Sequence, residues 1–418
     1  MGRLQPADHA FADPVPPHVG PPEPGPLQEA RAVDEDVVAA VQRTAESVLA
    51  ECVAEAALHD PEFSEAVAHR VADFTLRGGK RVRPRLLWWA MRACGAVETR
   101  AALRLGVGLE LIQTCALIQD DVMDRSRTRR GRPAVHIALA EQTGLAADSA
   151  AGAAFGASAA ILAGDLALVW ADDTVTETLL PSARRRQVRA LWRAMRSEMV
   201  AGQYLDLRGQ IGGGASAARA LRTACLKSAL YSVERPVALG AALAGADEWT
   251  TDALCSASRY AGLAFQLRDD LLGVFGDPTV TGKPSGDDIR EGKSTYLLAT
   301  ARTCADAADD HGALAVLDRA VGNPDLDEGG LAEVRAVLES TGARALVEEK
   351  AERLGERAAR RLAQAVDVDA HARDRLLGLL QAVAGARAAA PPGSRGAPRE
   401  PHPGAAATLT MVEGGRPQ

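Results

Sequence analysis

The sequence predicts an all-α protein built as one helical bundle. Ala and Leu run through the middle of the chain, whereas aromatic residues make up only 4% of its 418 residues. The alternation of Val, Ile and Thr with polar residues that predicts strands is rare. Long segments instead place apolar residues at the spacing of a helix face, and these segments are residues 34–57, 101–124, 156–172 and 254–275.

These segments differ in how they are expected to pack. Within residues 34–57, apolar side chains such as Val41 and Val48 fall on one side, which predicts a helix with one buried face. Residues 101–124 are apolar on nearly every face, as in a helix at the centre of a bundle. Breaks rich in Gly and Ser at residues 143–158 and 209–216 predict loops between helices.

Both ends of the chain differ in composition from its middle. The first 30 residues contain eight prolines and almost no apolar periodicity, and the end of the chain is rich in Pro, Gly, Ala and Arg. Such segments bury too little apolar surface to offset the entropy of ordering them. We therefore predict a single domain at residues 31–385 between disordered tails at residues 1–30 and 386–418. The tails could dock another protein or a compartment.

Composition excludes several classes of protein. The formal net charge of −7 argues against a nucleic-acid partner. The six cysteines are scattered singly, which argues against a zinc site or a disulfide framework and fits a reducing cytoplasm. We find no signal peptide and no run of about 20 apolar residues to span a bilayer. We therefore expect a cytoplasmic protein without a membrane span.

The first acidic motif follows an apolar helical segment. Asp120, Asp121 and Asp124 lie within five residues, and positions i and i+4 of a helix project from one face. Three neighbouring carboxylates repel one another unless a cation lies among them, and hard oxygen ligands suit Mg²⁺. The alternative interpretation is a solvated acidic helix end.

Two basic segments accompany this motif. Five arginines lie at residues 125–132, directly after the aspartates. A second segment, residues 77–85, combines basic side chains with Gly78 and Gly79, ahead of Pro84 at a predicted helix start. Guanidinium groups and helix N-termini both bind phosphate. Two such segments indicate two anionic groups, although the arginines could instead pair with nearby carboxylates.

A second acidic motif lies about 150 residues further along the chain. It contains Asp269 and Asp270 and is followed by Lys283, Asp287, Asp288 and Lys293. Taken alone, this stretch also fits a capped helix followed by a polar loop.

Together these motifs resemble the trans-isoprenyl diphosphate synthase (polyprenyl synthetase) family over residues 35–385. The family pattern Asp-Asp-x-x-Asp-x-x-x-x-Arg-Arg-Gly-x-Pro is matched at residues 120–133, and Gly-Gly-Lys-x-x-Arg-Pro is matched at residues 78–84. Gly-Gln-x-x-Asp and Leu-Ala-Gly-Asp are matched at residues 202–206 and 162–165. The family's Lys-Thr pair is Lys227-Ser228 here, which keeps the hydroxyl group.

The resemblance implies an isoprenoid synthase fold with a central apolar cavity, and an enzyme that condenses isopentenyl diphosphate with an allylic diphosphate. It implies magnesium, three ions per active site, and a homodimer. The implied metal residues are Asp120, Asp121, Asp124, Asp206, Asp269, Asp270 and Asp288. The implied residues for isopentenyl diphosphate are Gly79, Lys80, Arg83, Gln113, Arg130, Phe265 and Gln266. Those implied for the allylic diphosphate and for catalysis are Arg129, Gln203, Lys227, Ser228, Lys283 and Lys293.

One position departs from the family pattern. The second motif of the family usually ends in a third aspartate, and Gly273 stands there. This departure leaves a non-catalytic partner subunit of an active synthase as an alternative. A class I terpene cyclase also uses an aspartate-rich helix and Mg²⁺, but it would not need Lys80 for a second substrate.

Product length is expected to depend on residues just before the first aspartate. In the family, bulky aromatic residues four and five positions earlier stop the chain at fifteen carbons. Here these positions are Ala116 and Cys115, both small. We therefore expect geranylgeranyl diphosphate as the main product, with Trp170 as a possible deeper floor. Farnesyl diphosphate and longer chains are the alternatives.

Overall fold

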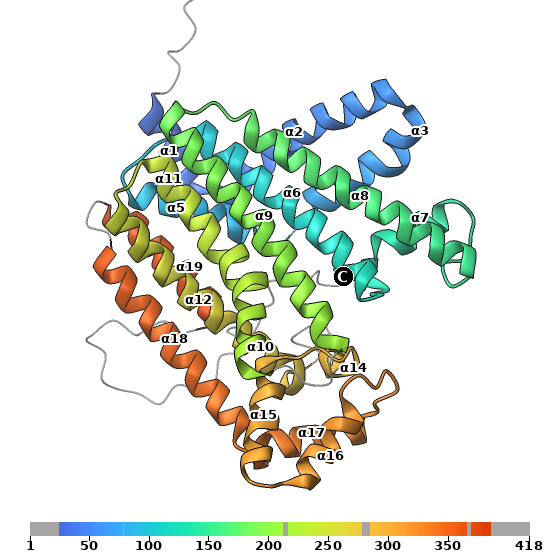
Figure 1. Ribbon diagram of the computed structural model, residues 1–418. Helices are drawn as coiled ribbons and strands as arrows, with labels where there is room; N and C mark the ends of the chain where they lie inside the picture. The colour runs from blue at the N-terminus through green and yellow to red at the C-terminus, as the bar shows by residue number, and fades with distance from the viewer. Residues whose placement is uncertain (1–24, 78, 212–215, 278–284, 366–368, 386–418) are drawn as a thin grey trace, which may run out of the picture.

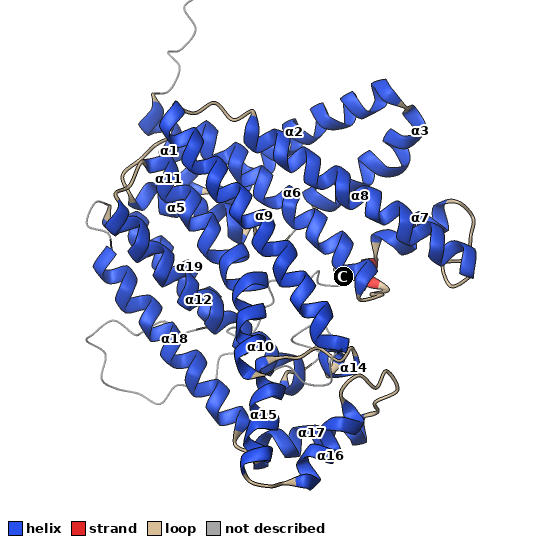
Figure 2. Ribbon diagram, in the orientation of Figure 1, coloured by secondary structure: helices blue, strands red, loops and turns tan. Residues whose placement is uncertain are grey.

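The computed structural model is almost entirely helical (Figure 2), and it describes residues 25–77, 79–211, 216–277, 285–365 and 369–385. The predicted all-α class is confirmed. In these ranges the only strands are β1 (Thr128–Arg129) and β2 (Arg132–Pro133), which pair antiparallel. Arg130 and Gly131 connect them with φ of 55° and 71°, the left-handed conformation that two-residue hairpin turns need.

The first half of the chain supplies one side of the bundle (Figure 1). Its helices, in chain order, are α1 (Pro26–Glu35), α2 (Val37–His59), α3 (Pro61–Phe63), η1 (Ser64–Ala68), α4 (His69–Leu76), α5 (Val82–Ala93), α6 (Thr99–Met123), α7 (Val135–Gln142), α8 (Ala150–Thr176) and α9 (Ser182–Ile211).

The second half completes the bundle and adds a group of shorter helices at one end, coloured orange in Figure 1. These elements are α10 (Ala217–Ala224), η2 (Cys225–Glu234), α11 (Arg235–Ala244), α12 (Glu248–Phe275), α14 (Asp287–Arg290), α15 (Tyr296–Ala307), α16 (His311–Ala320), α17 (Glu328–Ser340), α18 (Ala343–Ala365) and α19 (Ala370–Ala384).

The folded region begins earlier than the predicted domain start at residue 31. Helix α1 begins at Pro26, and its side chains Ala30 and Val33 are buried. Asp34 then accepts hydrogen bonds from Trp88 and Arg92 of α5, which ties α1 to the bundle. Residues 1–24 and 386–418, most of the predicted tails, lie outside the described residues.

Helix α6 is the core helix that the sequence predicts. Its side chains Leu105, Leu109, Leu111, Ile112 and Ile118 are fully buried. Because α6 ends at Met123, with Asp124 as its C-cap, the first acidic motif lies where the core helix meets the cavity. The apolar pattern of this helix therefore positions its carboxylates.

The loop predicted at residues 143–158 is only half correct. Ser149 accepts a hydrogen bond from the N–H of Gly152 at 3.0 Å, and this cap starts α8 at Ala150. A serine side chain at an N-cap satisfies a backbone donor that the first turn leaves free. Residues 150–158 are consequently the first turns of a long helix.

Two helices are long and apolar enough to cross a membrane, although we expected no such stretch. They are α6 and α8, judged by length and composition. The most apolar window of α6 is 78% buried inside the protein, whereas that of α8 is 33% buried. Core helices of soluble proteins meet the same criteria, and α6 packs as such a helix.

The segment η2 is a ten-residue π-helix between α10 and α11. π-Helical turns are wider than α-helical turns and are frequent at functional sites. Two glycines allow neighbouring helices to approach it closely. A β-carbon on Gly202 of α9 would lie 2.7 Å from the backbone nitrogen of Lys227, and one on Gly262 of α12 would lie 2.6 Å from the Cα of Ala229.

Candidate active site

A cavity of about 300 Å³ opens where α6, α9, η2, α12 and the segment after α14 converge. Its lining combines carboxylates and cations with apolar side chains. The acidic lining residues are Asp120, Asp206, Asp269, Asp270, Asp287 and Asp288. Arg83, Arg129, Lys227 and Lys293 supply the positive charge. A cavity of this size with converging polar groups is the usual form of a small-molecule site.

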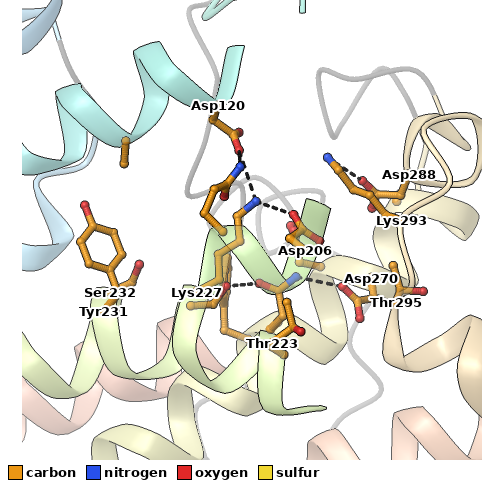
Figure 3. Close-up of a pocket in the computed structure, with 18 of the residues that line it drawn as sticks. Asp120, Asp206, Thr223, Lys227, Tyr231, Ser232, Asp270, Asp288, Lys293 and Thr295 are labelled. Atoms are coloured by element: carbon orange, nitrogen blue, oxygen red, sulfur yellow. Dashed lines mark hydrogen bonds and ion pairs between the residues drawn. The ribbon is translucent and has the colours of Figure 1, made fainter. Parts of the chain in front are cut away.

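Lys227 joins the first acidic motif to α9. Figure 3 shows its Nζ between Oδ1 of Asp120, at 3.2 Å, and Oδ2 of Asp206, at 2.7 Å. The Nε2 of Gln203 donates to the same Asp120 oxygen at 3.0 Å. Burial raises the pKa of Asp120, but Lys227, Lys293 and Arg129 outweigh it and lower the pKa overall, so this carboxylate is ionised.

Arg129 is held by the second aspartate of the motif. Its Nε and Nη2 donate to Oδ1 of Asp121 at 2.8 and 2.5 Å, and Nη2 lies 3.6 Å from Oδ2 of Asp120. Asp121 is fully buried. The hairpin of β1 and β2 turns Arg129 back onto α6, and Asp121 fixes the direction of its guanidinium group.

Lys293 joins the first acidic motif to the carboxylates of Asp288 and Glu291. Its Nζ lies 3.1 Å from Oδ2 of Asp124, 2.6 Å from Oε2 of Glu291 and 3.6 Å from Oδ1 of Asp288. Burial lowers the pKa of this lysine, but the three carboxylates outweigh burial and raise it. Lys293 therefore carries a charge between Asp124 and Asp288.

The second aspartate of the second acidic motif, Asp270, is a buried carboxyl group. The hydroxyl of Ser228 bonds to Oε1 of Gln266, and Nε2 of Gln266 donates to Oδ1 of Asp270 at 2.8 Å. Burial, with smaller contributions from the neighbouring Asp288 and Asp269, raises the pKa of Asp270 to about 8. Burial disfavours the charged form of a carboxyl group, and neighbouring carboxylates add to the effect.

Gly273 lies directly beside Asp288. A β-carbon on Gly273 would be 3.1 Å from Oδ2 of Asp288. The N–H of Gly286 also donates to the carbonyl oxygen of Gly273 at 2.8 Å, so the turn before α14 packs on α12. Where the family pattern has a third aspartate, a carboxylate from α14 approaches instead.

The sequence of the chain matches the profile of the polyprenyl synthetase family over residues 65–328. The chain belongs to this family. It is 31% identical over 307 residues to the geranylfarnesyl diphosphate synthase of Aeropyrum pernix, which covers 72% of this chain and 88% of that protein. It is 34% identical over 239 residues to a geranylgeranyl diphosphate synthase of Mycobacterium tuberculosis, covering 56% of this chain and 62% of that protein.

Solved structures give the same assignment for this polyprenyl synthetase family member. The geranylgeranyl pyrophosphate synthase of Corynebacterium glutamicum, solved with isoprenyl diphosphate and magnesium, matches with a TM-score of 0.75 and 36% identity. The match covers 83% of this chain and 99% of that chain. The isoprenoid synthase fold and the assignment as a trans-prenyltransferase, both expected from the motifs, are confirmed.

The polyprenyl synthetase motifs do not all converge on the cavity. Gly79 and Lys80 are exposed in the loop before α5, while Arg130 lies over the ring of Phe74 at 5.1 Å and donates to its carbonyl oxygen at 3.4 Å. Ala116 lines the cavity. Cys115 is fully buried and Trp170 is nearly so, and neither is among the cavity-lining residues of the described chain. Gly78 and Lys283 lie outside the described residues.

Two lining residues were missed by sequence reasoning. Tyr231 donates its hydroxyl proton to Oε1 of Gln113 at 2.9 Å, and its ring lies 5.0 Å from the guanidinium carbon of Arg83. Arg83 also donates to the hydroxyl of Ser232 at 2.7 Å. Both follow Lys227 at about one helical turn, a spacing that could have indicated them.

The donor set of this polyprenyl synthetase suits Mg²⁺, which prefers carboxylate oxygens, waters and phosphate oxygens. Within the described residues, no three acidic, His or Cys side chains gather closely enough to hold an ion alone. Instead, Lys227 lies between Asp120 and Asp206, and Lys293 lies between Asp124 and Asp288. Burial is the largest cause of the raised pKa of Asp270, and a bound cation would favour the ionised form of this carboxyl group. These observations fit ions that the carboxylates of the cavity share with a bound anion.

Proposed function

We propose that this enzyme transfers an allylic prenyl group to isopentenyl diphosphate and releases geranylgeranyl diphosphate. The observation that carries this proposal is one cavity with two charged regions around Lys227. In Figure 3, Tyr231 and Ser232 lie on one side of this lysine, while Asp270, Asp288 and Lys293 lie on the other. Two diphosphates of like charge need such separate regions.

Isopentenyl diphosphate would bind at the first region. Arg83 supplies a cation and Gln113 an amide from the cavity lining, and Lys80 and Arg130, which lie outside this lining, are predicted to join them when the substrate binds. Because Tyr231 donates to Oε1 of Gln113, the amide nitrogen of Gln113 is left to donate to a phosphate oxygen. A class I terpene cyclase has no use for this region, so the proposal favours chain elongation.

The allylic diphosphate would bind at the second region. Arg129, Lys227 and Lys293 face its oxygens, and Lys283 is predicted to join them. Asp120, Asp124 and Asp269 would hold Mg²⁺ directly, with three ions expected and with Asp121, Asp206, Asp270 and Asp288 in support. When bound, the metal neutralises charge on the diphosphate leaving group.

The reaction then follows from charge. The bond between the allylic carbon and the diphosphate oxygen breaks, and the electron pair leaves with the diphosphate, where Arg129 and Lys227 stabilise it. The double bond of isopentenyl diphosphate attacks the allylic cation and forms the new carbon–carbon bond. Oxygen dipoles of Ser228, Gln203 and Gln266 face the positive charge. The departing diphosphate takes the final proton, since no histidine lines the described cavity.

Product length would be limited at Ala116, because this small side chain lines the cavity whereas Cys115 does not. A methyl group in this place leaves room below the aspartates for a growing chain. This supports a product of twenty carbons. The structurally similar protein of Corynebacterium glutamicum is named a geranylgeranyl pyrophosphate synthase, which also supports this length.

The deciding experiment is a product analysis. The purified enzyme is incubated with Mg²⁺, isopentenyl diphosphate and each short allylic diphosphate, and the products are identified by mass. We expect geranylgeranyl diphosphate from dimethylallyl, geranyl and farnesyl primers. A product of fifteen or twenty-five carbons would contradict the length assignment. No product with any primer would favour the non-catalytic partner subunit.

The proposed enzyme is a cytoplasmic homodimer that pairs through α8 and α9. Phe155, Leu162 and Val169 recur every seven residues on α8 and are 44%, 63% and 54% exposed. Val200 and Tyr204 of α9 are also exposed. A second copy of the chain would cover these apolar side chains. Sedimentation of the wild type and of Leu162→Glu would test this, with a dimer expected only for the wild type.

A further inference from the structure

The basic loop before α5 contains an arginine that faces inward. Arg81 stands between Lys80 and the first turn of α5, yet it is only 3% exposed. Its φ is +48°, a left-handed conformation that residues other than glycine rarely adopt. The family pattern leaves this position variable. Burial of an arginine in such a conformation indicates that its side chain is held by specific partners.

Three helices hold the guanidinium group. The Nη1 of Arg81 donates to Oε2 of Glu110 on α6 at 2.5 Å. The Nη2 donates to Oε1 of Gln42 on α2 at 2.7 Å and to the carbonyl oxygen of Leu76 at 2.9 Å. Both terminal nitrogens therefore donate to protein oxygens, and Arg81 is not among the residues that line the described cavity.

These contacts close the loop on itself. Leu76 is the last residue of α4 and Val82 is the first residue of α5, so Arg81 binds the point at which its own loop begins. The loop also contains Gly79, at φ +30°, a residue with wide conformational freedom. The contacts of Arg81 therefore tie the start of α5 to the end of α4 and to the core helix α6.

Glu110 provides the opposite charge on the core helix. It is 9% exposed and lies one turn before Gln113 on α6. It also acts on the neighbouring arginine: burial lowers the pKa of Arg130, Glu110 opposes this, and Arg81, Arg129 and Arg83 add to the lowering. Glu110 is thus a buried carboxylate that pairs with Arg81 and also acts on Arg130.

We infer that the buried pair of Arg81 and Glu110 positions Lys80 and Arg83 to bind the diphosphate of isopentenyl diphosphate. Both are positioning residues, because they act through the loop and through α5 rather than by touching the substrate. The inference rests on the proposed assignment of Lys80 and Arg83 to this substrate. It adds that a carboxylate outside the cavity sets the affinity for one of the two substrates.

The test compares Glu110→Gln with a matched control, Asp34→Asn. The control removes the charge from Asp34, a half-buried carboxylate of α1 that pairs with Arg92 of the same helix α5 at 2.9 Å. We expect Glu110→Gln to raise KM for isopentenyl diphosphate about tenfold while kcat and KM for the allylic diphosphate change less than about twofold. Asp34→Asn is expected to lower thermal stability without this selective change.

A double variant separates the loss of the ion pair from a general destabilisation of the protein. Arg81→Gln/Glu110→Gln removes both charges and leaves no unpaired buried charge, so it is expected to fold even where a single variant does not. If the two residues act as a pair, the rise in its KM for isopentenyl diphosphate should be smaller than the rises in Arg81→Gln and Glu110→Gln multiplied together. Isothermal titration with isopentenyl diphosphate should give the same order of affinities.

Three outcomes would overturn the inference. They are an unchanged KM for isopentenyl diphosphate in Glu110→Gln and in the double variant, an equal rise of KM for both substrates, and the same selective rise in Asp34→Asn. Lys80→Ala distinguishes a failure of the proposed substrate pocket from a failure of the positioning role. If Lys80→Ala leaves KM for isopentenyl diphosphate unchanged, the proposed pocket itself is wrong. If it raises this KM while Glu110→Gln does not, only the positioning role fails.

Discussion

Replacing Gly273 by Asp would restore the third aspartate of the second motif, and we expect it to destabilise the metal-free enzyme. A β-carbon at this position would lie 3.1 Å from Oδ2 of Asp288, and the turn before α14 bonds directly to the Gly273 carbonyl. The new carboxylate would have to enter space that the Asp288 carboxylate already occupies.

The size of the effect follows from Coulomb's law. Two carboxylates about 4 Å apart repel each other by about 4 kcal/mol at an effective dielectric near 20. The Asp288 side chain is 31% exposed and lies 3.6 Å from Lys293. Solvent and the lysine screen part of the repulsion, so we retain about half, roughly 2 kcal/mol. For a protein of this size this loss lowers the unfolding temperature by a few degrees.

Thermal unfolding in a chelator measures this loss, with Gly273→Ala as the control. Alanine adds only a β-carbon and is favoured over glycine within a helix by about 0.5–1 kcal/mol, so this variant should match or exceed the wild type. Added Mg²⁺ should narrow the gap between the Asp and Ala variants, because a cation relieves the repulsion. If the Asp variant is as stable as the Ala variant without metal, Asp288 does not lie where the reasoning places it.

Three further predictions concern the cavity. Ala116→Phe should shift the products towards fifteen carbons, because Ala116 lines the cavity. Cys115→Phe should lower stability without such a shift, because Cys115 does not line it. Product mass and thermal unfolding check both variants, and a shift with Cys115→Phe alone would refute this prediction. Asp120→Asn should lower kcat about 100-fold or more, because it removes the carboxylate that faces Lys227 and Gln203. The circular dichroism of the helices should be retained. Near-normal turnover in saturating Mg²⁺ would refute the metal assignment. Tyr231→Phe should raise KM for isopentenyl diphosphate by about three- to tenfold, because Gln113 loses the bond that orients its amide; an unchanged KM would show that the amide needs no such partner.

The fold could be predicted because its helices carry their own signals. Residues 34–57 and 254–275 correspond to α2 and α12, and the apolar segment 101–124 is the buried helix α6. The failure at residues 143–158 has a local cause. Gly and Ser favour a loop there, but Ser149 is a helix cap and the Ala-rich sequence after it propagates the helix.

The sequence indicates which residues form the candidate site, but it does not indicate which of them contact one another. Sequence spacing indicates which aspartates share a helix face, yet it gives no partner for Asp124, whose ion pair with Lys293 spans 169 residues. The inward direction of Arg81 could not be predicted either, because neighbouring basic residues all resemble ligands for phosphate. Which of them binds the protein depends on the buried carboxylate of Glu110, far away in sequence. The catalytic and binding roles of the site residues stay predictions.

The close backbone packing around η2 also has a consequence for how variants of this enzyme are interpreted. Lys227 is set against Asp120 by two glycines on the helices that flank it, Gly202 and Gly262, and any side chain there would push the backbone of η2 aside. In a random mutagenesis screen, substitutions at these glycines would have the same effect as losing Lys227, the lysine that we propose for catalysis. Substitutions that move Lys227 by small steps are therefore expected where α9 and α12 pack against η2.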